Sequence, residues 1–120
     1  QPNVVVAGAY LSDWFPPGKK DLRAAFVVME NLVRSHAAAY HAIHEVQPEA
    51  RVGLSVYYRG FEAARNWFPP DKLMAFGFQR MFNDFFPMAA KDGKLRYLYR
   101  THSLPQAKST QDFLGLNYYT

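Results

Sequence analysis

Two long helical patterns, each followed by a short β-prone run, are the feature that most constrains the fold of this chain. We expect a helix over residues 21–47, a strand over 51–58, a second helix over 71–86 and a strand over 112–119. Helices that alternate with strands favour parallel pairing through right-handed crossovers, which is the α/β class. Two strands alone do not make a stable parallel sheet, because both faces and both edges of such a sheet must be covered by other elements. We therefore expect one segment of a larger α/β fold, incomplete as a stand-alone domain and without an internal domain boundary over residues 1–120.

The helix boundaries rest on capping residues and prolines. Asp21 is a suitable N-cap for the first helix, and Pro48 should end it at residue 47. Asp71 is the corresponding N-cap candidate of the second helix, which Pro87 should stop. Residues 1–20 are expected to be the end of a strand or a loop, followed by a turn, and residues 91–111 to be polar and rich in turns.

Composition excludes several classes of function. The 120 residues are 49% hydrophobic and carry a formal net charge of +4, with no apolar run near the roughly 18 residues of a membrane span. Because no such run exists, no membrane is predicted as a partner. The basic residues are scattered, so no nucleic acid is predicted as a partner either. The chain has no cysteine, which excludes thiolate chemistry and weakly favours a cytoplasmic location.

Aromatic and histidine residues leave choices open. Aromatic residues make up 17% of the chain, and they suit a hydrophobic core as well as a sugar-binding site. His41 and His44 are three residues apart, but the pattern offers no third ligand to complete a metal site. No metal and no other cofactor is therefore predicted.

Seven short segments occur in an order that resembles glycoside hydrolase family 1, the retaining β-glycosidases. Each match is weak alone, but together they span the whole chain. They are Gln1-Pro2-Asn3, Gly8-Ala9-Tyr10, Pro16-Pro17-Gly18, residues 31–40, Arg51-Val52-Gly53, residues 82–86 and residues 112–120 with the run Asp-Phe-Leu-Gly-Leu-Asn-Tyr-Tyr-Thr.

The resemblance implies a partial (β/α)8 TIM barrel, from the end of barrel strand 4 to the end of strand 6. Active sites of such barrels lie at the C-terminal ends of the strands. Gln1 would stand at the family's acid/base position, where an amide cannot transfer a proton, and the nucleophile would lie outside this chain. Tyr119 would orient that nucleophile, Asn117 would face the same pocket, and Tyr57 and Trp67 are candidates for contact with the substrate.

Three hypotheses follow for the function. The first is a segment of a β-glycosidase that hydrolyses β-glucosides or related β-glycosides through a glycosyl-enzyme intermediate, with a β-glycoside or an oligosaccharide as its substrate. The isolated 120 residues should then be inactive, with the remainder of the barrel or a second copy as partner. The alternative is a non-catalytic carbohydrate-binding domain derived from such a barrel, motivated by Gln1 and the aromatic content. A generic α/β domain with accidental matches is the third.

Overall fold

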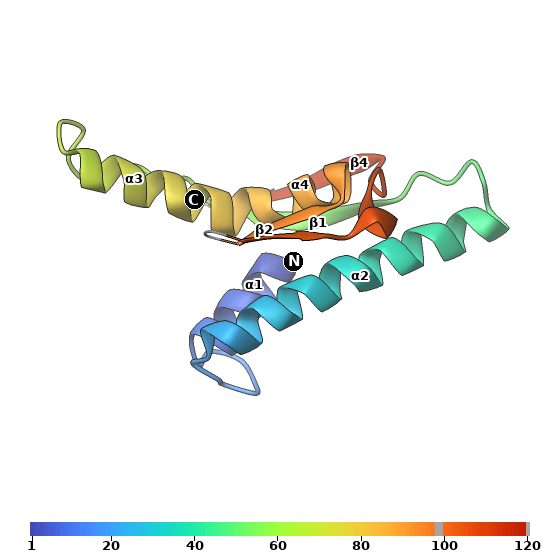
Figure 1. Cartoon of the computed structure of the whole chain (residues 1–120), viewed down its shortest axis with the longest axis horizontal. Coiled ribbons are helices and arrows are strands. Elements are labelled where there is room, and N and C mark those ends of the chain that lie inside the picture. The colour runs from blue at the N-terminus through green and yellow to red at the C-terminus, as the bar shows by residue number, and fades with distance from the viewer. Residues whose placement is uncertain (98–99, 120) are drawn as a thin grey trace.

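A parallel pair of strands, β1 (Gly53–Tyr58) and β4 (Phe113–Tyr118), lies at the centre of the fold (Figure 1). The computed structural model describes residues 1–97 and 100–119. The register runs from Gly53 opposite Phe113 to Tyr58 opposite Tyr118. The predicted parallel pairing across a helical crossover is therefore confirmed, and Thr120, the last residue of the matching motif, lies outside the described residues.

The long helix α2 (Leu22–Val46) has the predicted boundaries. The Asp21 carboxylate accepts hydrogen bonds from the backbone N–H groups of Arg23 and Ala24, at 2.9 and 3.1 Å. The helix ends at Gln47, directly before Pro48. Its buried face is Ala25, Met29, Val33 and Ala37, spaced by four residues, and this face joins the core cluster that includes Val56 of β1.

The expectation of a strand end or loop was wrong for residues 2–11, whereas the predicted turn follows over residues 12–17. The N-terminal residues form a short helix, α1 (Pro2–Val6), which continues into the wider π-helical turn η1 (Ala7–Leu11). Pro2 occupies the first helical turn, where its missing N–H costs nothing and its fixed φ suits the helix. Figure 1 shows α1 beside the first turns of α2.

The second predicted helix is longer than expected and is interrupted. It consists of α3 (Pro69–Phe78), the π-helical segment η2 (Gln79–Asp84) and α4 (Phe85–Asp92). The predicted N-cap, Asp71, lies inside the first turn, because Pro69 and Pro70 can start a helix themselves. The predicted stop at Pro87 was also wrong, because the proline falls in the first turn of α4, just after the register changes in η2.

The segment predicted as turn-rich contains an antiparallel hairpin. Strands β2 (Lys94–Tyr97) and β3 (Arg100–Ser103) pair from Lys94 opposite Ser103 to Tyr97 opposite Arg100, and a short 3₁₀ turn, η3 (Pro105–Ala107), follows. Only Leu95 of the eight strand residues is fully buried, so the sequence reads as polar. Gly93 forms the predicted turn as the left-handed C-cap of α4, with φ of 69°.

One face of the parallel pair is only partly covered. Val56 on β1 is buried against the core that α2 helps to form, whereas Leu116 and Tyr118 on the same face of β4 are 59% and 63% exposed. This exposure agrees with the expectation of an incomplete α/β fold. None of the described helices combines the length and hydropathy that crossing a bilayer requires.

Candidate active site

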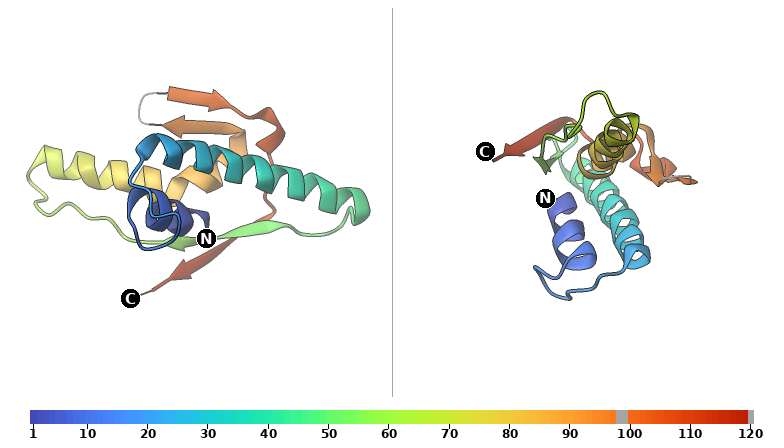
Figure 2. Two further views of the ribbon diagram at one scale, coloured as in Figure 1. Left: turned by 90° about the horizontal axis from the view of Figure 1, so that it is seen from below. Right: turned by 90° about the vertical axis from the view of Figure 1, so that its left-hand side faces the viewer.

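The carboxyl ends of β1 and β4 bring three of the predicted site residues together. Tyr57 stands opposite Asn117 in the parallel register, and Tyr119 follows directly after β4. The rings of Tyr57 and Tyr119 lie 5.3 Å apart between centroids and are tilted by 59°. Figure 2 shows the N-terminus beside the end of β1, on the side toward which β4 points.

Gln1 completes this group from the other end of the chain. Its side-chain amide donates a hydrogen bond to the Tyr119 hydroxyl at 3.4 Å, across 118 positions of sequence. The backbone carbonyl of Gln1 accepts from the N–H groups of Val4 and Val5, so the residue is fixed as the start of α1. Gln1 and Tyr119 are both exposed, which leaves their polar groups open to a ligand.

Asn117 is held by the strand beside it. Its amide donates to the Ser55 hydroxyl at 2.6 Å. Ser55, Tyr57 and Asn117 share one face of the pair, because side chains two residues apart on a strand point the same way. This face therefore carries polar side chains beside the Tyr57 ring, whereas the opposite face carries Val56 and Leu116.

Asn3, which sequence reasoning missed as a positioning residue, supports the end of β1. Its side-chain amide donates to the backbone carbonyls of Tyr57 and Phe82, at 2.6 and 3.2 Å, and accepts from the Tyr57 N–H at 3.3 Å. The residue is 6% exposed. No signal in a single sequence distinguishes such a buried asparagine from one on the surface.

Asn83 of η2 binds the backbone of Arg59, two residues beyond Tyr57, in the same way. Its amide donates to the Arg59 carbonyl at 2.7 Å and accepts from the Arg59 N–H at 3.1 Å. A third bond joins it to the Gln79 side chain at 2.8 Å. Side-chain amides thus replace a neighbouring strand along the edge of β1 that β4 does not cover.

Trp67 lies in a separate arrangement after β1. Its described ring and cation contacts are with Phe68, at 5.7 Å, and with the Arg65 guanidinium, at 5.9 Å. Arg65 is held by two side-chain hydrogen bonds to Asp71, which lower the pKa of Asp71 and raise that of Arg65. Trp67 itself is 77% exposed, so its predicted contact with substrate stays a prediction.

A hydrogen-bonded carboxylate, that of Asp112, lies at the opposite, amino-terminal end of the strand pair. Asp112 precedes β4 and accepts from the Val52 N–H and the Tyr40 hydroxyl, at 2.8 and 2.9 Å. These bonds, the backbone one foremost, hold the pKa of Asp112 below its ordinary value. The hydrogen bond to this carboxylate in turn raises the pKa of Tyr40.

The histidines of α2 bind backbone carbonyls. His41 contacts the Gln106 carbonyl at 2.9 Å and His44 contacts that of Tyr40 at 2.9 Å. Within residues 1–97 and 100–119, no three potential ligands gather around a point where a metal could be held.

At the strand ends, the group formed by Gln1, Tyr57, Asn117 and Tyr119 consists of amides and phenols. These side chains can hydrogen-bond to hydroxyl groups and stack against the apolar face of a sugar ring. The Gln1 amide can hold an oxygen atom but cannot give it a proton. These four side chains therefore offer hydrogen-bond donors, acceptors and ring faces, and none of them is a carboxyl group.

Comparison with known proteins identifies the family. The sequence profile described as Glycosyl hydrolase family 1 matches residues 1–120. A 1,4-beta-D-glucan glucohydrolase of Thermotoga neapolitana is 27% identical over 133 aligned residues, and Beta-glucosidase A of Thermotoga maritima is 26% identical. The whole chain is covered in both cases, but it spans only 31% and 29% of these relatives.

Solved structures agree with the sequence matches. A beta-glycosidase from Pyrococcus horikoshii superposes with a TM-score of 0.88 at 32% identity, covering the whole chain and 27% of that structure. A beta-glucosidase from Thermotoga maritima in complex with glucoimidazole superposes with a TM-score of 0.85 at 26% identity, covering the whole chain and 30% of that structure. The fold is accordingly part of the barrel expected from the sequence motifs, and the chain belongs to glycosyl hydrolase family 1.

Proposed function

We propose that the protein containing this segment is a retaining β-glycosidase that acts on β-glucosides or related β-glycosides. In this proposal the segment runs from the end of barrel strand 4 to the end of strand 6. Two carboxyl groups normally share the work in such enzymes, one as nucleophile and one as acid and base. Gln1 occupies the position of the second, and the nucleophile comes from outside these 120 residues.

The observation that carries the proposal is the contact between Gln1 and Tyr119. Residues from the two ends of the chain meet at 3.4 Å beside Tyr57, at the carboxyl ends of two parallel strands. Barrel enzymes build their active sites at these ends. Family membership and the names of the relatives, glucohydrolase and beta-glucosidase, support the same class of substrate.

Each residue then has a defined task. The Tyr119 hydroxyl hydrogen-bonds the nucleophile carboxylate, which orients it and favours its ionised form. Asn117 binds a sugar hydroxyl from the same face. Tyr57 and Trp67 contact the leaving group side of the substrate. The Gln1 amide holds the glycosidic oxygen without protonating it, so the leaving group must depart as an anion.

The proposal predicts a steep dependence on the leaving group. With the complete protein, 2,4-dinitrophenyl β-glucoside should be cleaved, whereas an alkyl β-glucoside, whose leaving group needs a proton, should not. Azide should release the glycosyl-enzyme as β-glucosyl azide, because an anionic nucleophile needs no general base. Formation of the glycosyl azide is read by chromatography and mass spectrometry.

Gln1→Glu is the decisive variant. It should restore cleavage of the alkyl glucoside by about 10²–10⁴-fold, the usual contribution of a general acid. Gln47→Glu, at the exposed end of α2, is the matched control and should change nothing. Equal cleavage of both glucosides by the parent protein, or no gain in Gln1→Glu, would contradict the proposed position of Gln1.

A carbohydrate-binding domain without catalysis is the second candidate. The amide at position 1 and the exposed rings of Trp67 and Tyr119 favour it. It predicts that the complete protein binds β-glucosides in calorimetry but leaves even the dinitrophenyl glucoside intact, with or without azide. Turnover of that substrate excludes it.

A further inference from the structure

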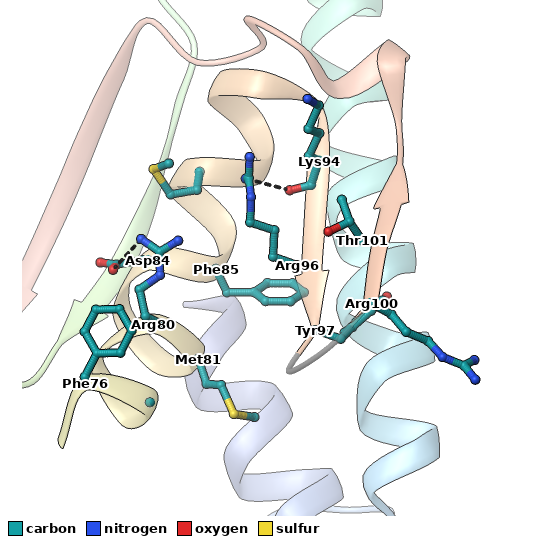
Figure 3. A pocket seen from close by; sticks show the side chains of 12 residues that line it. Phe76, Arg80, Met81, Asp84, Phe85, Lys94, Arg96, Tyr97, Arg100 and Thr101 are labelled. Atoms are coloured by element: carbon teal, nitrogen blue, oxygen red, sulfur yellow. Dashed lines mark hydrogen bonds and ion pairs between the residues drawn. The ribbon is translucent and has the colours of Figure 1, made fainter. Parts of the chain in front are cut away.

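A cavity lies apart from the group of residues at the strand ends. It has a volume of about 480 Å³ and separates the helical run α3–η2–α4 from the hairpin β2–β3 (Figure 3). It shares no lining residue with the group around Gln1 and Tyr119. Its volume is within the usual range for small-molecule sites.

The helical side of the cavity carries most of its apolar lining. Its lining there includes Phe76, Met81, Phe85 and Met88. Gly77 lies among them on α3, and a Cβ atom added to it would meet nothing within 4 Å. Open space therefore reaches the helix backbone at Gly77.

Four of the lining residues are cationic. Arg80, Lys94, Arg96 and Arg100 all line the cavity, with Asp84 as the one acidic lining residue. Arg80 pairs with Asp84 at 3.7 Å, and Arg96 pairs with Asp92, outside the lining, at 2.5 Å. Arg80 and Arg96 are thus each paired with one carboxylate, and Lys94 adds a further positive charge to the lining.

Two guanidinium groups are placed to receive an anion. Figure 3 shows Arg80 reaching from the helical side toward Asp84 and Arg96 reaching from β2 toward the Lys94 carbonyl, whereas Arg100 points away. The Arg80 and Arg96 side chains remain 42% and 39% exposed. A guanidinium has five N–H donors, so each retains donors after its carboxylate is bound.

We propose that this cavity binds a small amphipathic organic anion, an aromatic group that carries a phosphate or carboxylate. The ring lies over Gly77 against the apolar side, and the anionic group is held between Arg80 and Arg96. A neutral sugar has neither an aromatic ring nor an anionic group, so this site is independent of the proposed glycosidase function. Burial of apolar surface and charge-assisted hydrogen bonds both favour binding, so a ligand that has both parts should bind more tightly than one that has either.

The test uses 2-naphthyl phosphate as the probe, with 2-naphthol and inorganic phosphate as its two halves. Isothermal titration calorimetry with the complete protein should give binding of 2-naphthyl phosphate at least about tenfold tighter than that of either half. Raising the ionic strength should weaken the binding, because exposed charges are screened. Equal binding of 2-naphthol, equal binding of phosphate, or no binding at millimolar probe would overturn the proposal.

Three variants locate the site. Arg80→Gln and Arg96→Gln should each weaken binding of 2-naphthyl phosphate by about tenfold, the loss of one charge-assisted contact. Lys72→Gln, on α3 but outside the lining, is the charge-matched control and should bind as the parent does. Full binding by both arginine variants would refute the cationic subsite.

Gly77→Leu separates loss of the site from loss of the fold. The leucine side chain should fill the cavity and abolish binding, while its higher helix propensity maintains or raises the melting temperature. Unchanged binding by a folded Gly77→Leu protein would place the ligand elsewhere. The arginine variants and the salt dependence test the proposal independently if Gly77→Leu melts lower than expected.

Discussion

Replacing Asn3 by leucine should loosen the carboxyl end of β1 without opening a cavity. Leucine is close to asparagine in shape but can make none of its hydrogen bonds. The substitution removes both bonds that the Asn3 amide donates, to the carbonyls of Tyr57 and Phe82, and the bond that it accepts from the Tyr57 N–H. Three backbone groups then need new partners.

The three bonds set the size of the effect. A buried backbone group left unpaired costs about 1–3 kcal/mol. Tyr57 and Phe82 are only half-buried, so water reaches part of the exposed edge and the penalties do not add in full. We expect a loss of about 2–4 kcal/mol in the free energy of unfolding, a large part of the ~5–15 kcal/mol typical of a domain.

Urea denaturation followed by circular dichroism measures this loss. With a slope of about 1–3 kcal/mol per molar urea, the midpoint should fall by roughly 1–2 M while the slope stays constant. Asn31→Leu is the matched control, since Asn31 is exposed on α2, and it should shift stability by no more than about 0.5 kcal/mol. If Asn3→Leu and Asn31→Leu unfold at the same urea concentration, the amide does not stabilise the edge of β1.

Asn3→Asp tests the same geometry by its pH dependence. The new carboxylate would face the carbonyl oxygens of Tyr57 and Phe82, which disfavours its ionised form and raises its pKa in the folded state. The deficit in stability relative to the parent should therefore be largest above that raised pKa. It should shrink as the pH falls toward about 4, where the carboxyl is protonated and can donate. A deficit that does not change with pH would refute this explanation.

Two further predictions concern the strand pair. Asp112→Asn should lower the melting temperature at pH 7, because the Val52 N–H binds the carboxylate and lowers its pKa below the ordinary value of 3.8. The difference in melting temperature between variant and parent should vanish as the pH falls through that lowered pKa. Gly53→Ala should lower the free energy of unfolding in urea by about 1–3 kcal/mol, since the added Cβ would lie 2.2 Å from the Phe113 carbonyl oxygen. The Cβ of the control Gly60→Ala meets nothing within 4 Å, so this variant should be nearly neutral. Equal costs for the two alanines would show that the parallel strand pair can shift at Gly53 to accommodate the Cβ.

The parts of the fold with strong local signals were predictable. Asp21, a periodic apolar face and Pro48 define α2 within the sequence itself, and short β-prone runs define β1 and β4. Prolines were the main source of error, because a proline can start a helix as readily as it can stop one. Pro2 starts α1, and Pro87 is tolerated because the π-helical segment η2 resets the helix just before it.

The candidate site was predictable only as a set of residues. The sequence motifs placed Gln1, Tyr57, Asn117 and Tyr119 at chain positions that a parallel strand pair brings to one end. The contact of Gln1 with Tyr119 depends on the path of α1, which the sequence reasoning did not identify as a helix. Asn3 escaped attention for the same reason, since its role depends on tertiary contacts with β1 and η2.

The two asparagines have separable effects on this site. Asn3 binds the edge of β1 from α1, the helix that also presents Gln1 to Tyr119. Asn83 binds the same edge from η2 and has no described contact with Gln1. Loosening Asn3 should therefore disturb both the strand and the position of Gln1, whereas Asn83→Leu should disturb the strand alone. Both variants should lower the stability of the complete protein. Only Asn3→Leu should also reduce the gain in alkyl glucoside cleavage that Gln1→Glu provides. An equal reduction by both would mean that the end of β1, and not α1, sets the position of residue 1.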